Sequence, residues 1–122
     1  MNKPAPLFDF IERDPDNPAA FWINHEEIGG RARFLIKKPT FGTRSQFHQV
    51  KSLYIGTSSP TPELEAMADY AATFDVCFEI SPFTSVDNNP AVLDFNEIID
   101  FRLIRAASSE VGAYWQSFRV DN

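Results

Sequence analysis

The fold is decided by residues 29–38, which read GGRARFLIKK. Ala32, Phe34 and Ile36 alternate with mainly basic residues, so one face of this segment is apolar and the other is basic. A period of two predicts a strand with one buried face, and the two glycines before it supply the dihedral angles of a turn. The aromatic run at residues 20–23 lies on the other side of that turn. We therefore predict two neighbouring strands, joined through the glycines, at the start of the domain.

Further along the chain, hydrophobic spacing and capping residues predict four helices and one more strand. In order, these are a helix over 43–54, a helix from Pro62 to about Thr73, a strand over 74–80, a helix capped by Asp94, and a last helix capped by Ser108 or Ser109. The last two helices should form a hairpin. The predicted fold class is α+β: a small mixed or antiparallel β-sheet, helices on one face, and a C-terminal helical hairpin.

The length of 122 residues predicts a single domain. Residues 1–19 contain prolines, acids and asparagines, which is typical of a flexible N-terminal arm, so we place the domain at residues 20–122. The arm contains Phe8 and Phe10, which make it apolar enough to dock on another surface.

Composition excludes several classes of protein. Hydrophobic residues make up 43% of the chain and aromatic residues 14%, which is too apolar for a disordered chain. The single cysteine excludes an intrachain disulfide framework. No apolar run approaches the roughly 20 residues that a membrane span needs, and no leader pattern opens the chain. We expect a cytoplasmic protein.

Charge is divided unevenly along the chain, whose net charge is −6. Residues 1–61 carry a net charge of +2 and residues 62–122 a net charge of −8. Opposite patches of this kind can steer copies of one protein toward each other, although a simply uneven solvated surface is the alternative. Binding to nucleic acid is not expected, because the chain as a whole repels phosphate.

Residues that carry catalysis or bind metals are few and poorly placed. His25 precedes Glu26 and Glu27, but adjacent residues in a loop rarely point at one ion. Cys77 has no base near it in the sequence, which favours a passive buried thiol. No glycine loop that would hold a phosphate is present. We therefore predict no enzyme, no metal site and no cofactor.

More apolar side chains are present than one compact face requires. The alternatives are that they all meet in one core or that some contact a partner. The candidate interface residues, for copies of the chain or for a client, are Phe8, Phe10, Arg31, Arg33, Lys37, Lys38, Phe101, Ile104, Tyr114, Trp115 and Phe118.

The order of elements resembles that of the tail assembly chaperones of long-tailed bacteriophages. The resemblance spans about residues 20–119 and is carried by four segments. They are Arg31–Thr40 leading into a helix, Phe74–Glu79, Asp94–Ile99, and a helical end at Tyr114–Phe118. Where many members have tryptophan and glycine, this chain reads Phe-Glu-Ile-Ser at residues 78–81, so the glycine is missing.

The resemblance implies a small α+β protein without a cofactor. Such a protein self-associates, in a head-to-tail manner if two different patches meet, and coats the tape-measure protein before tail-tube subunits replace it. The alternative is an acidic inhibitor of a basic host protein, which would use Asp87, Asp94, Glu97 and Asp100 to mimic phosphates. Neither hypothesis involves nucleic acid as a ligand, a membrane or an enzymatic reaction.

Overall fold

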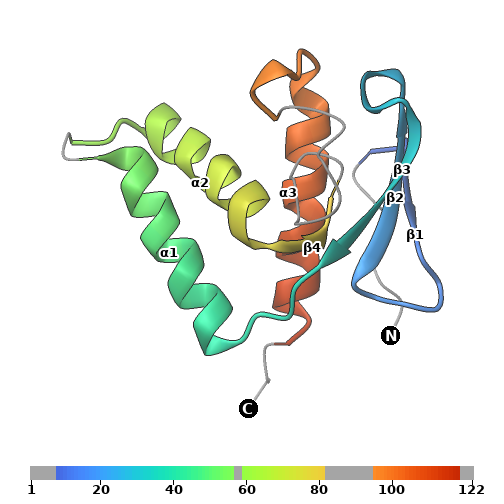
Figure 1. Ribbon diagram of the computed structural model, residues 1–122, viewed down its shortest axis with the longest axis horizontal. Helices are drawn as coiled ribbons and strands as arrows, with labels where there is room; N and C mark the ends of the chain where they lie inside the picture. Colours follow the sequence, from blue (N-terminus) through green and yellow to red (C-terminus); the bar gives the residue numbers. More distant parts are fainter. Residues whose placement is uncertain (1–7, 57–58, 82–94, 119–122) are drawn as a thin grey trace.

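A computed structural model describes residues 8–56, 59–81 and 95–118 of the protein (Figure 1). Its strands are β1 (Ile11–Arg13), β2 (Ala20–His25), β3 (Gly30–Ile36) and β4 (Phe78–Ile80). They form one antiparallel sheet in the order β1-β2-β3-β4. The predicted α+β class is confirmed, and the described sheet is antiparallel.

Three α-helices lie on one side of this sheet (Figure 1). They are α1 (Phe41–Ile55), α2 (Pro62–Val76) and α3 (Phe101–Gln116), and two short 3₁₀ turns, η1 (Glu26–Ile28) and η2 (Phe95–Glu97), complete the described elements. In Figure 1, α3 stands between the sheet and the hairpin that α1 and α2 form. The helix nearest the sheet is therefore the last of the described helices.

The inner face of the sheet carries the centre of the core. Phe21 on β2 lies directly opposite Phe34 on β3, and their rings stack with centroids 4.9 Å apart. Phe78 on β4 meets Phe34 edge-on at 5.5 Å. The turn before β3 needs its two glycines, because Gly29 and Gly30 have φ angles of 78° and 106°. The alternation at residues 29–38 thus sets both the register and the core.

Small and branched residues on α3 cover this face. Leu103, Ala106, Ala107 and Val111 are all buried and recur at helical spacing. Glu110 lies in the same stripe, and its carboxylate forms a two-pronged ion pair with the guanidinium of Arg13 on β1, at 2.8 and 3.0 Å. This pair joins the first described strand to the last helix.

The predicted strand over residues 74–80 is wrong in its first half. Residues up to Val76 belong to α2, and the backbone N–H of Cys77 still donates to the carbonyl of Thr73 at 2.9 Å. Only Phe78–Ile80 is extended. Phe74, Val76 and Phe78 are all buried, so their alternation reflects burial at the end of a helix rather than a single strand.

The predicted C-terminal hairpin is also wrong within the described residues. Ser108 and Ser109 lie in the middle of α3, which begins at Phe101 with Asp100 as its cap. Asp94 lies outside the described residues. The helical hairpin of this structure is formed instead by α1 and α2, which begin after the caps Thr40 and Thr61.

The predicted boundary at residue 19 needs a correction. Residues 11–13 form β1 and pair with β2, so this part of the predicted arm belongs to the sheet. Residues 1–7 of the arm lie outside the described residues.

The helix predicted over residues 43–54 is confirmed as α1, but its packing is unusual. None of its fifteen residues is buried, and Leu53 and Tyr54 are 80% and 49% exposed. Its partner is α2, so the hairpin leans away from the sheet (Figure 1). Among the described helices, none combines the length and apolar character of a bilayer span.

Candidate binding groove

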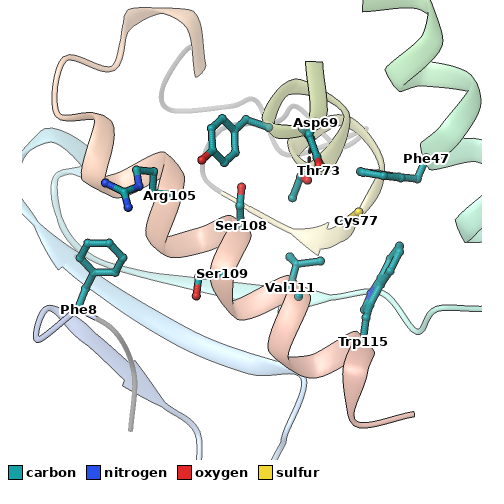
Figure 2. Close-up of a pocket in the computed structure, with 12 residues that line it drawn as sticks. Phe8, Phe47, Asp69, Thr73, Cys77, Arg105, Ser108, Ser109, Val111 and Trp115 are labelled. Atoms are coloured by element: carbon teal, nitrogen blue, oxygen red, sulfur yellow. Dashed lines mark hydrogen bonds between the residues drawn. The ribbon is translucent and has the colours of Figure 1, made fainter. Parts of the chain in front are cut away.

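A groove of about 450 Å³ lies where the helical hairpin meets α3 (Figure 2). One wall is formed by α3 from Arg105 to Trp115, a distance of about 15 Å along a helix. Phe47 of α1, and Asp69 and Thr73 of α2, stand on the opposite wall. The volume falls in the range of about 300–1,000 Å³ that is usual for ligand clefts.

Aromatic side chains close one end of the groove. Trp115 and Phe47 face each other edge-on with ring centroids 6.0 Å apart. The indole N–H of Trp115 donates to the backbone carbonyl of Lys37 at 2.9 Å, which fixes the ring beside the end of β3. The guanidinium of Arg44 lies 5.5 Å from the Trp115 ring centroid. This end is therefore rigid, apolar and bordered by a cation.

Polar groups line the rest of the groove. The Oγ of Ser108 is buried and has no hydrogen-bond partner. Asp69 is neutralised by the ammonium of Lys51 at 3.7 Å, and the hydroxyl of Thr73 donates to the Asp69 carbonyl. Arg105 is exposed and has no ion pair among the described residues. The described groove therefore leaves a cation and a hydroxyl unused.

Cys77 lies in the floor of the groove but is fully buried. Burial, together with the nearby Asp69 carboxylate, raises the pKa of its thiol to about 12. No histidine is among the residues that line the described groove, and its carboxylate, Asp69, pairs with the ammonium of Lys51. This arrangement does not suit nucleophilic catalysis.

The thiol of Cys77 is expected to be unreactive in the folded protein. At pH 8 a maleimide or an aromatic disulfide should modify less than about a tenth of it, because the thiolate is the reactive form, and denaturant should restore full reaction. The Met67→Cys variant adds an exposed thiol and should react rapidly with one equivalent. Rapid modification of the native wild-type protein would contradict this prediction.

A second hollow of about 330 Å³ lies on the other side of α2. Leu64, Met67 and Ala71 of α2 line it together with Phe101 and Ile104 of α3. Leu64, Met67 and Phe101 are 37%, 56% and 41% exposed. α2 is thus flanked by the groove, whose lining is mixed, and by this mainly apolar hollow, and Tyr70 lines both.

The predicted interface residues do not form one surface. Ile104 and Tyr114 are only 7% and 8% exposed and belong to the core, which corrects their assignment to an interface. Phe101 and Phe118 are exposed. Trp115 is partly buried and lines the groove.

Phe8 and Phe10 also pack against the core rather than project from it. Their rings are stacked at 5.4 Å, and both side chains are half-buried. Phe8 lines the groove and Phe10 meets the ring of His25 edge-on at 5.9 Å. Only Phe8 of this pair therefore contributes to the groove.

The predicted basic block is divided. Arg31 and Arg33 lie over the ring of Trp22 and pair with Glu12 and Asp14 at 3.1 and 3.9 Å. Register places them on the outer face of the sheet, away from the helices. Lys38 is exposed and Lys37 is half-buried at the end of β3. The block thus does not act as one free cationic patch.

Three further side chains that could ligate a metal come together at the start of α3. Ligand atoms of His25, Glu27 and Asp100 lie within 4.8 Å of one another. The carboxylate of Glu27 accepts from the backbone N–H groups of Ile99 and Asp100 at 2.9 and 2.6 Å. Nδ1 of His25 accepts from the Glu27 N–H, so its Nε2 carries the proton donated to Asp100 at 2.9 Å. These hydrogen bonds link the end of β2 to the start of α3.

Added Zn²⁺ is expected to leave the melting temperature of the protein unchanged to within about 1 °C. A metal would have to displace the proton on Nε2 and the two backbone donors, each of which then loses a hydrogen bond. Thermal unfolding with and without an excess of Zn²⁺ measures this. A rise that disappears in the His25→Ala variant would instead identify a metal site.

Asp100 should make stability depend on acid pH. The pKa of its carboxyl is held well below the ordinary value of 3.8, chiefly by the guanidinium of Arg102 and then by His25. A depressed pKa in the folded state stabilises the protein above the unfolded value, and this stabilisation is lost as the pH falls below about 4. Denaturant unfolding between pH 5 and pH 2 should therefore show a smaller loss for Asp100→Asn than for the wild type. The exposed Glu63→Gln variant serves as the control, and equal losses in all three proteins would contradict the expectation.

Two of these features escaped sequence analysis. The ion pair of Arg13 with Glu110 joins segments that no local pattern relates, although a charged residue inside an apolar helical stripe was a signal for a buried partner. The groove itself was not foreseen, because it depends on how far the hairpin stands from α3.

Comparison with known proteins yields no match, whether with protein-family models, with curated proteins or with solved structures. The resemblance to tail assembly chaperones therefore stays a hypothesis. The groove, the second hollow and the exposed hairpin are the features from which a function is inferred.

Proposed function

We propose that this protein is an assembly chaperone that self-associates and coats a long helical client, as a phage tail assembly chaperone coats the tape-measure protein. The observation that carries the proposal is the pair of hollows beside α2, namely the groove and the mainly apolar second hollow. A subunit of a coat needs contacts with its neighbours and with its client, so it needs more than one adhesive surface. Helical partners dock through apolar residues into grooves of this kind.

The exposed hairpin supports the same proposal. Leu53, Leu64 and Met67 are each more than a third exposed, and they lie in the last turn of α1 and the first two turns of α2. Exposed clusters of large apolar residues are typical of surfaces that bind a partner. Weak contacts repeated along a client also suit a coat that must later be displaced.

The alternative of an acidic inhibitor receives no comparable support. Asp100, one of its four proposed phosphate mimics, is engaged by His25 and Arg102 and caps α3. Asp87 and Asp94 lie outside the described residues. Glu97 is exposed but alone does not make an anionic surface.

Co-expression with the tape-measure protein of the same genome tests the proposal. The two proteins should co-purify, and the isolated chaperone should form oligomers that grow with concentration and shrink as salt screens their charges. A protein that stays monomeric by light scattering at every concentration and salt, and that leaves the tape-measure protein insoluble, is not such a chaperone.

A further inference from the structure

The hairpin tip, defined here as Leu53, Tyr54 and residues 61–67, is the least covered part of the described fold. Every residue from Thr61 to Met67 is exposed. Leu53, Leu64 and Met67 present apolar side chains there, and they lie at the end of the hairpin farthest from the sheet (Figure 1). Two carboxylates, Glu63 and Glu65, accompany them in the first turn of α2, and Glu65 lies 3.8 Å from the ammonium of Lys51. The tip therefore combines exposed apolar side chains with the carboxylate of Glu63, and Leu64 and Met67 also form the rim of the second hollow.

The groove has the complementary character. Its lining combines apolar side chains with hydroxyls, and Arg105 stands at the end away from Trp115 (Figure 2). A second cation, the guanidinium of Arg44, lies 5.5 Å from the Trp115 ring centroid. Its own acid, Asp69, pairs with Lys51, whose ammonium is shared with Glu65. A ligand with apolar side chains and flanking carboxylates would use both the free cation and the apolar lining.

We propose that the hairpin tip of one copy of this chain docks in the groove of the next copy. The inference rests on the self-association in the proposed function and names the two surfaces that meet. The tip and the groove are different parts of the molecule, so each docking event leaves one free tip and one free groove. A heterologous contact of this kind builds open head-to-tail chains unless the rotation between copies closes a ring.

Two single variants separate the surfaces. Met67→Glu puts a third carboxylate on the tip, where it would be buried against the aromatic end of the groove. Gly112→Glu fills the groove, because Gly112 lines it and a Cβ there would meet nothing within 4 Å. Each variant should raise the dissociation constant for self-association at least about tenfold, since an unpaired buried carboxylate is unfavourable. Met67→Leu and Gly112→Ala are the matched controls and should assemble like the wild type.

Mixing the two blocked variants gives the decisive result. The Gly112→Glu chain keeps a normal tip and the Met67→Glu chain keeps a normal groove. Sedimentation velocity should therefore show each variant alone as a monomer and the equimolar mixture as a dimer that grows no further. Both substitutions lie at exposed positions, so melting temperatures near that of the wild type should show that folding is intact.

Other outcomes overturn the inference. If both variants alone assemble as the wild type does, the copies meet elsewhere, while the chaperone proposal survives. If the mixture stays monomeric, or only one variant is affected, the contact is not tip-to-groove. If Gly112→Glu loses the tape-measure protein but still assembles, the groove takes the client and not a second copy. A wild-type monomer at every concentration removes both the interface and the proposed function.

Discussion

Replacing Phe34 with alanine is expected to lower the free energy of unfolding by about 3–5 kcal/mol. Its side chain is fully buried, stacks on Phe21 and meets Phe78 edge-on. Truncation removes a large apolar area from the core and leaves a cavity between three strands. Because small domains are stable by only about 5–15 kcal/mol, this loss should bring the midpoint of urea unfolding down sharply.

Leu35→Ala is the matched control for this change. Leu35 is the next residue of β3 but lies on the opposite face of the sheet and is only half-buried. The Leu35→Ala substitution should lower the free energy of unfolding clearly less than Phe34→Ala does in the same urea titration. Similar losses at the two positions would mean that the inner face is not the centre of the core.

Replacing Arg13 with alanine is expected to lower the free energy of unfolding by about 3–5 kcal/mol, as much as truncating a core aromatic residue. The Glu110 side chain is only 6% exposed, and Arg13 gives it both of its charged hydrogen bonds. Without the guanidinium, the carboxylate stays buried with no countercharge. The same pair raises the pKa of Arg13, chiefly through the side-chain hydrogen bond to Glu110, so its charge is secure at any ordinary pH.

The double variant Arg13→Met, Glu110→Leu tests the origin of that loss. Two apolar side chains of similar volume need no countercharge, so this protein should regain most of the stability that Arg13→Ala loses. Equilibrium unfolding in urea measures both proteins. A double variant as unstable as Arg13→Ala would show that the loss of stability came from packing rather than from the unpaired charge of Glu110.

Sequence patterns predicted the elements that local physics controls. The alternation around Phe34 gave β3 and its buried face, and Thr61 with Pro62 gave the start of α2. At Phe74–Ile80 the pattern misled, because the apolar residues Phe74 and Val76 are buried at the end of α2, whereas Phe78 is buried in β4. At Ser108 the hydroxyl resembled a cap, whereas small residues in fact let α3 approach its neighbours as one continuous helix.

Local sequence patterns could not predict the groove or the long-range contacts that α3 makes. Whether Trp115 or Tyr114 faces the core depends on which side of α3 meets the sheet. The two residues are adjacent on one helix, so the sequence alone could not show which of them is buried. The cluster of His25, Glu27 and Asp100 was missed for a related reason. In the sequence His25 is adjacent to Glu26 and close to Glu27, whereas Asp100 lies 75 positions from it.

The ion pair between Arg13 and Glu110 has a consequence for synthesis on the ribosome. Its two residues are 97 positions apart, and the bond from Trp115 to Lys37 spans 78. The first strands emerge early, but the helix that covers them follows only after α1, α2 and β4 have been synthesised. Because contacts so distant along the chain slow folding, the nascent sheet must wait with exposed aromatic rings, and a chain that stops before residue 101 would be an open, aggregation-prone fragment.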